Sequence, residues 1–312
     1  MKDIIIIAGP TASGKTSLSI GLAKELNGEI ISADSMQIYK GMTIGTAKIR
    51  PEEMDGVVHH LVDELEPDDR YTAADFKEKA EALIEDISSR GKIPMIVGGT
   101  GLYINSLIYE LNMKEANTDL DLRKRLEKEA EMIGAEKFYE KLKAVDPKAC
   151  EKIHFNNVKR VIRALEVYET TGKRFSDQYD FRKKNDKYNP IYFCLTMDRA
   201  KLYDRINMRI DMMLDEGLIE EVKALLEKGY NRELASMQGL GYKEIISYLD
   251  GKIALEEAIY ILKRDTRRFA KRQLTWFRRE DMVHWVDKDK FENEEMILKH
   301  CLEYYEKKRR ER

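Results

Sequence analysis

A buried strand and a glycine-rich turn near the N-terminus restrict the folds open to this chain more than any other feature. Residues 4–8 read IIIIA, and residues 9–16 read GPTASGKT, which fits the pattern G-x-x-x-x-G-K-T. An amphipathic segment, 17–26, follows. Strand, loop and helix in this order predict a phosphate-binding loop, because its glycines let several backbone N–H groups face one anion. Lys15 adds positive charge, and the Thr16 hydroxyl can complete the coordination shell of Mg²⁺. The alternative is an ordinary glycine-rich turn before a helix.

Composition indicates a soluble globular protein of the cytoplasm. Of 312 residues, 43% are hydrophobic and 36% are charged, enough for one main core and a second, smaller one. The longest apolar run is too short to span a bilayer, and no signal-peptide pattern precedes it. Cys150, Cys194 and Cys301 are far apart and lack C-x-x-C spacing, which argues against a zinc site or a disulfide framework. The net charge of −2 excludes a surface that is basic throughout, so nucleic acid would have to bind local basic patches.

Two further strands end in polar residues. The strand predicted at 29–33 precedes Asp34, and the strand at 93–97 precedes Gly98-Gly99-Thr100-Gly101. The β-α-β order predicts a parallel sheet, whose ligands lie beyond the carboxyl ends of the strands. Asp34 is therefore expected beside the phosphate loop, as a general base, as an outer-sphere magnesium ligand or simply as a turn cap. The glycines are expected to let a ligand approach the backbone, with a plain tight turn as the alternative.

From residue 112 the sequence becomes rich in charged residues and has the pattern of helices. Residues 112–189 are predicted to form a helical insertion into a sheet domain made of 1–111 and 190–312. Within the insertion, the helix predicted at 157–170 has Arg160 and Arg163 on one face, which is either a solvated surface or a phosphate contact.

The sheet resumes with a strand predicted at 190–198. This strand ends in Asp198, which leaves open a magnesium-binding aspartate of the NTPase kind. A later helix, 255–279, interleaves arginines with Phe269, Trp276 and Phe277. Aromatic and basic side chains in this arrangement can stack on bases and bind phosphates, and they can equally belong to a helix that buries its aromatic face. The expected fold class is α/β, a P-loop NTPase-like parallel sheet flanked by helices, with a helical insertion domain.

Several segments together resemble the tRNA dimethylallyltransferases, also called tRNA isopentenyltransferases or the IPP transferase family. They run in family order as GPTASGKT (9–16), SADSMQIY (32–39), GGTGLY (98–103), RVIRALE (160–166), RINMRIDMM (205–213), GLGYKE (239–244) and TRRFAKRQLTWF (266–277). Asn157 stands where the family often has Asp. The Cys/His zinc finger of eukaryotic members is absent from this sequence, so the resemblance is to the bacterial type.

The resemblance implies transfer of a dimethylallyl group from dimethylallyl diphosphate to N6 of the adenosine at position 37 of tRNAs that read codons beginning with U. The partners would be dimethylallyl diphosphate and the tRNA anticodon stem-loop, which the insertion would hold, and the cofactor would be Mg²⁺ bound at Thr16. A monomer is expected. The catalytic residues implied are Asp34 as base, Thr100 beside the adenosine, and Lys15 at the leaving diphosphate.

The resemblance also implies two sets of binding residues. Those for the diphosphate are Gly9, Pro10, Thr11, Ala12, Ser13, Gly14, Lys15, Thr16 and Arg205. Those for tRNA are Asp34, Ser35, Met36, Gln37, Thr100, Arg123, Val158, Lys159, Arg160, Val161, Ile162, Arg267 and Arg272.

Three other functions remain open from the sequence. A P-loop small-molecule kinase would use Asp34 as the base and place Asp198 near magnesium. An adenylate isopentenyltransferase would run the same reaction on free nucleotides. A nucleic-acid-binding protein would keep the phosphate loop only as a vestige.

Overall fold

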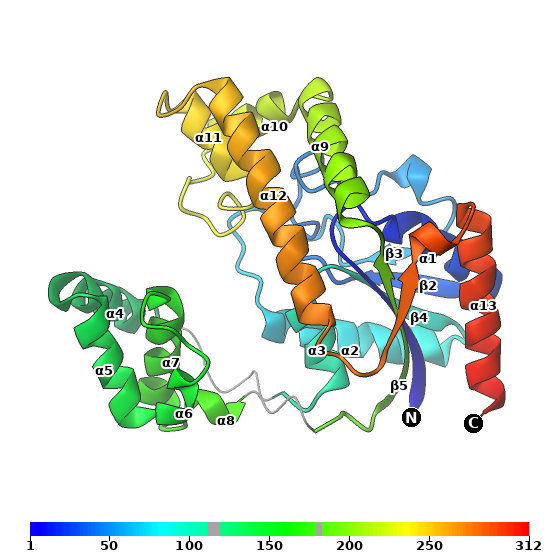
Figure 1. The fold of residues 1–312 in the computed structure, drawn as a ribbon, viewed down its shortest axis with the longest axis horizontal. Coiled ribbons are helices and arrows are strands. Elements are labelled where there is room, and N and C mark those ends of the chain that lie inside the picture. The colour runs from blue at the N-terminus through cyan, green and yellow to red at the C-terminus, as the bar shows by residue number, and fades with distance from the viewer. Residues whose placement is uncertain (112–118, 179–182, 312) are drawn as a thin grey trace. The chain divides into compact units, whose positions relative to one another are not determined.

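A six-stranded parallel sheet forms the centre of the larger part of the chain (Figure 1). The computed structural model describes residues 1–111, 119–178 and 183–311. The strands lie in the order β3-β2-β4-β1-β5-β6, and every neighbouring pair is parallel. Their bounds are β1 Lys2–Ala8, β2 Gly28–Ser32, β3 His59–His60, β4 Ile93–Gly98, β5 Tyr188–Thr196 and β6 Val283–Asp287. The predicted α/β fold class is confirmed.

The sheet is covered on both faces because its central strand is apolar on both sides. In β1, Ile5 and Ile7 belong to one core cluster, and the alternate residues Ile4 and Ile6 are equally buried. The cluster of Ile5 and Ile7 includes side chains of α1 (Lys15–Leu26) and α13 (Glu294–Arg310). Helix α2 (Ala73–Ser89) packs against β2 and β4. Its N-cap is Thr72, whose hydroxyl accepts from the Asp75 N–H.

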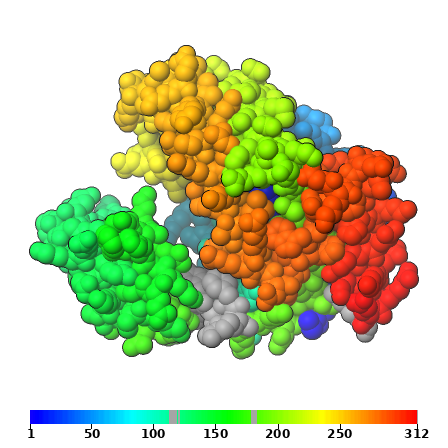
Figure 2. Space-filling view, viewed as in Figure 1, coloured from blue at the N-terminus to red at the C-terminus, as the bar shows by residue number. Residues whose placement is uncertain are grey.

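Four helices between β5 and β6 and two short 3₁₀ helices also belong to this part of the chain. They are α9 Arg199–Asp215, α10 Leu218–Glu227, α11 Tyr242–Leu249 and α12 Leu255–Phe277, with the short 3₁₀ helices η1 Pro51–Glu53 and η2 Lys288–Lys290. Helix α3 Gly101–Ile108 begins in this part and ends in the second part of the chain. Helix α12 packs against α9 and α11, and the space-filling view shows α9 and α12 side by side on the surface (Figure 2).

Contacts divide the chain into two compact units. One comprises Met1–Ile104 and Asp186–Arg312, and the other comprises Asn105–Asn185. The sequence led us to expect the divisions at 111/112 and 189/190, and Asn112 lies outside the described residues. The second unit contains α4 Leu120–Ile133, α5 Ala135–Val145, α6 Pro147–Cys150, α7 Val158–Thr171 and α8 Phe175–Gln178. Its own core is built around Leu126, Phe138 and Val161.

No helix in the described ranges combines the length and apolar character needed to cross a bilayer.

Candidate active site

The phosphate loop joins β1 to α1 and wraps around its own lysine. Gly9 (φ 146°) and Gly14 (φ 93°) adopt backbone conformations that other residues rarely take. The Lys15 ammonium donates to the carbonyls of Gly9 (3.1 Å) and Pro10 (2.9 Å). Burial lowers the pKa of Lys15 to about 8, with the nearby Asp34 charge opposing that shift and the Arg209 charge adding to it. The loop carbonyls thus hold the ammonium where an anion can reach it, and its pKa lies only slightly above neutral pH.

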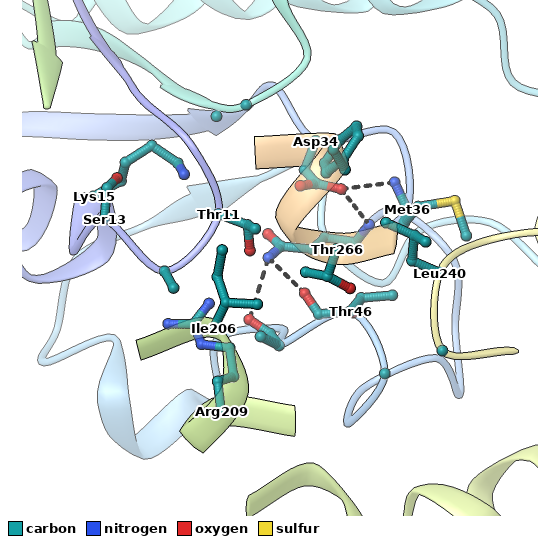
Figure 3. A pocket seen from close by; sticks show the side chains of 18 of the residues that line it. Thr11, Ser13, Lys15, Asp34, Met36, Thr46, Ile206, Arg209, Leu240 and Thr266 are labelled. Carbon is teal, nitrogen blue, oxygen red and sulfur yellow. Dashed lines mark hydrogen bonds between the residues drawn. The ribbon is translucent and has the colours of Figure 1, made fainter. Parts of the chain in front are cut away.

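Asp34 follows β2 and faces the same space as Lys15. Its Oδ1 accepts from the N–H groups of Met36 (2.9 Å) and Gln37 (3.4 Å), so it does cap the next turn. Figure 3 shows the loops that carry Lys15 and Asp34 on one side of the pocket, with α9 and its Ile206 and Arg209 on another. The capping bonds use one carboxylate oxygen, which leaves Oδ2 free of this task. Capping and base chemistry are therefore compatible in this side chain.

The turn after β4 is the third wall. Gly98, Gly99 and Thr100 line the pocket, and the Thr100 N–H donates to the carbonyl of Ala33 (3.2 Å), next to Asp34. A Cβ at Gly98 would lie 2.2 Å from Ala33 O, and one at Gly99 would lie 2.1 Å from Gln273 Nε2. These glycines are required because other parts of the protein approach them closely. The sequence led us to expect that a ligand did so.

Two arginines of α9 add positive charge. Arg205 donates from Nε to the carbonyl of Ala12 in the phosphate loop (2.9 Å). Arg209 lies one turn further along and also lines the pocket, and burial together with the charge of Arg205 lowers the pKa of Arg209. Two guanidinium groups and Lys15 therefore converge on one space, which favours a strongly anionic ligand.

The loop at 43–47 contributes residues 45–47 to the pocket lining and is held by two side chains. The Gln37 amide donates to the carbonyls of Thr46 (3.3 Å) and Ala47 (3.2 Å). From α10, the Glu221 carboxylate accepts three backbone N–H groups, those of Thr43, Ile44 and Gly45, at 2.7–3.0 Å. The hydroxyl of Tyr242 donates to the same carboxylate (2.7 Å).

These walls enclose one cavity of about 670 Å³. Its lining is polar and cationic at the phosphate loop and at the two arginines of α9. Elsewhere on α9 and α12 it is apolar, where Ile206, Ile210, Leu262 and Phe269 face it. Arg272 and the buried Gln273 of α12 also line it. Such a cavity suits a ligand with an anionic end and an apolar end.

Among the described residues, no group of three or more His, Cys, Asp or Glu side chains could hold a metal. Mg²⁺ at a phosphate loop needs no such cluster, since phosphate oxygens and one hydroxyl supply ligands there. Thr16 lines the cavity at the start of α1, and the Ser13 Oγ in the loop is fully buried with no hydrogen-bond partner in the protein. The residues present thus fit a magnesium-bound diphosphate.

Residues 37–280 match the IPP transferase family. The chain belongs to this family. It is 57% identical to the tRNA dimethylallyltransferase of Acetivibrio thermocellus over 98% of this chain and 97% of that protein, and 53% identical to that of Lachnoclostridium phytofermentans, covering 96% of both.

Solved structures agree with the family assignment. The tRNA isopentenylpyrophosphate transferase of Bacillus halodurans matches with a TM-score of 0.74 and 47% identity, over 98% of this chain and 97% of that one. A eukaryotic dimethylallyltransferase described as acting on tRNA matches with a TM-score of 0.77 and 33% identity, over 92% of this chain and 74% of that one.

In this IPP transferase, the expected residues of the sheet unit gather at the cavity. Asp34, Ser35, Met36, Gln37, Thr100, Arg205, Arg272 and residues 11–16 all line it. Gly9 and Pro10 are not part of the lining, although their carbonyls accept from Lys15. Arg267 is half-buried and donates to Asn207 of α9 (2.7 Å), so it joins two helices.

Asp198 is not at the cavity, which corrects one expectation left open by the sequence. It is the N-cap of α9 and accepts from the N–H groups of Ala200 (2.8 Å) and Lys201 (3.2 Å). An aspartate after a strand is equally suited to starting a helix, and the sequence does not distinguish these roles.

The residues expected to bind tRNA in the helical unit divide by exposure. Lys159 and Arg160 are exposed, but Val161 (1% exposed) and Ile162 (5%) pack in the core of that unit. Their side chains are therefore unsuited to the expected tRNA contact. Arg123 forms an ion pair with the fully buried Glu166 (2.7 Å), which stabilises the helix pair α4–α7.

Three further residues belong to the site although the sequence did not predict them there: Gln273, Glu221 and Arg209. Arg209 had a signal, because it lies four residues after Arg205 on the same helix face. Gln273 lies inside the motif TRRFAKRQLTWF, whose many basic residues predict phosphate binding and give no indication of a role for the amide. Nothing local to Glu221 indicates that it anchors a loop some 180 residues earlier.

Proposed function

We propose that this chain transfers a dimethylallyl group from dimethylallyl diphosphate to the N6 amine of an adenosine in tRNA. The observation that carries the proposal is the single cavity in which the phosphate loop, Asp34 and the apolar side of α9 and α12 meet. The family membership and the names of the relatives support it.

The reaction breaks the bond between the allylic carbon and the diphosphate oxygen and forms a bond from that carbon to N6. Negative charge develops on the leaving diphosphate, where the loop amides, Lys15 and Arg205 stabilise it electrostatically. Thr16 would hold Mg²⁺ together with the diphosphate, and the ion would supply further charge neutralisation when bound.

Asp34 would take the proton that N6 loses. The N6 lone pair is delocalised into the adenine ring, so the amine needs a base in the transition state. We infer that Thr100, which lies beside Asp34 and donates its N–H to Ala33 O, orients the adenine edge. The apolar residues of α9 and α12 would exclude water from the allylic cation.

For the tRNA itself, we propose that the adenosine leaves the anticodon stack to enter the cavity. Arg272 on α12 and the exposed Lys159 and Arg160 on α7 are the proposed phosphate contacts, and the target is position 37 of tRNAs that read codons beginning with U. The enzyme would act as a monomer in the cytoplasm, where tRNA is found.

The experiment is transfer of label from radiolabelled dimethylallyl diphosphate in the presence of Mg²⁺. Unmodified tRNA and AMP serve as alternative acceptors, and ATP hydrolysis is measured in parallel. Label on tRNA alone supports the proposal. Label on AMP alone would show that the acceptor is a free nucleotide. ATP turnover without label on either acceptor would favour a small-molecule kinase.

A further inference from the structure

Gln273 is the one polar side chain of α12 that lies deep at the junction of two cavity walls. It is 7% exposed. Its Oε1 accepts from the Thr11 N–H in the phosphate loop (2.9 Å), and its Nε2 donates to the carbonyl of Gly99 (3.0 Å). One amide therefore joins the end of β1 to the end of β4, across more than 170 residues of chain in each case.

The orientation of this amide is determined by its partners. A backbone N–H can only donate and a carbonyl can only accept, so the reversed amide would place like groups against each other on both sides. The fit is also close, since a Cβ at Gly99 would lie 2.1 Å from Nε2. The turn after β4 thus leaves room for this one contact.

Both partners lead directly to groups that the proposed reaction uses. Thr11 stands within the loop that would hold the diphosphate. Gly99 precedes Thr100, whose N–H donates to Ala33 O, and Ala33 is next to Asp34. Gln273 has no place at the reacting atoms, and its hydrogen bonds are both to backbone.

We propose that Gln273 is a positioning residue that sets the distance between the diphosphate loop and the Asp34–Thr100 side of the cavity. This inference rests on the proposed function. A displacement of about 1 Å between reacting groups can cost on the order of 10² in rate, so an amide that fixes this separation matters to turnover.

The two bonds are separable by substitution. Gln273→Glu keeps an acceptor for Thr11 and has a donor for Gly99 only while its carboxyl is protonated. A buried carboxyl can titrate near pH 8–9. We expect the ratio of variant to wild-type kcat to fall about tenfold from about pH 6 to about pH 9, with KM for dimethylallyl diphosphate changed less than about threefold. Taking the ratio removes any pH dependence of kcat that the variant and the wild type share.

Gln273→Leu removes both bonds. We expect kcat to fall about 10- to 100-fold at every pH and the Kd for dimethylallyl diphosphate, measured by calorimetry without tRNA, to rise about tenfold. Gln238→Glu is the matched control, because this exposed amide also donates to a backbone carbonyl, that of Arg232 (2.7 Å), and does not line the cavity. It should match the wild type in every assay.

A merely structural role predicts a different result. Melting temperature would fall in both variants, while kcat ratio and KM would stay near wild type at all pH values, and that outcome overturns the inference. If the wild type fails to prenylate tRNA, the proposed function is wrong. The calorimetric comparison still decides on Gln273, because it needs no transfer, and unchanged affinity in Gln273→Leu would then reject the inference.

Discussion

At the scale of single residues, Asp34 has two tasks that one substitution can separate. Oδ1 caps the turn at Met36 and Gln37, and the proposed base is the carboxylate. Asp34→Asn retains a capping oxygen but not the base, so we expect kcat to fall by about 10² or more with tRNA affinity nearly unchanged. Asp34→Ala should lose the cap as well and weaken tRNA binding. Single-turnover rates and filter binding measure the two effects, and equal losses of rate and affinity in Asp34→Asn would make Asp34 a recognition residue.

Lys15 gives a prediction about pH. Its pKa is lowered to about 8 in the protein by burial. A bound diphosphate favours the charged form and raises that pKa, so binding takes up a proton above pH 8. Affinity for dimethylallyl diphosphate should therefore decrease as pH rises from about 8 to about 10, where the diphosphate is already ionised. Calorimetry in buffers of different ionisation enthalpy detects the proton. Lys15→Met should bind weakly and lack this pH dependence; a wild type without proton uptake contradicts the assignment.

At the scale of elements, the loop 43–47 depends on α10. Glu221 is the acceptor for three N–H groups of that loop. Glu221→Ala leaves these donors without their partner, and we expect the free energy of unfolding to fall by about 1–3 kcal/mol. Glu220→Ala removes an exposed carboxylate from the same helical turn and serves as control. Urea titrations of the two variants measure the difference, and equal stabilities would show that the loop is held by other contacts.

At the scale of the whole molecule, the near-zero net charge makes tRNA binding depend on local patches. On α12, Arg268, Lys271, Arg272, Thr275, Trp276 and Arg279 surround a second, more open hollow. Arg272 borders both this hollow and the main cavity and lies over the Phe269 ring (5.8 Å). A polyanion that extends from the main cavity into this second hollow would therefore contact Arg272.

Salt dependence tests that placement. Arg272→Gln should weaken tRNA binding and lower the slope of log K against log salt by about 0.7–0.9, the value for one lost phosphate contact. Arg267→Gln should change the slope less, because Arg267 is bonded to Asn207. Binding measured from low to moderate salt distinguishes the two variants. Equal slopes for Arg272→Gln and the wild type would show that the Arg272 side chain is solvated and does not contact a tRNA phosphate.

The sequence alone determined the local parts of this protein. The apolar run before G-x-x-x-x-G-K-T places the phosphate loop between a strand and a helix, because this conformation depends on neighbouring residues and their backbone preferences. The parallel sheet and the position of Asp34 and Thr100 beside the loop follow from β-α-β order, since strand ends in such a sheet face one side. The family motifs at 205–213 and 266–277 also indicated α9 and α12, two helices that line the cavity.

Only the tertiary structure decided which side chains hold these parts together. Gln273 and Glu221 bond to backbone far away in the chain, and no periodicity or spacing encodes a partner at that distance. The same holds for Gly98 and Gly99, whose missing side chains make room for Ala33 and Gln273. Burial on α7 likewise separates Lys159 and Arg160 from Val161 and Ile162. Local sequence specifies conformation, whereas these contacts arise when distant segments pack.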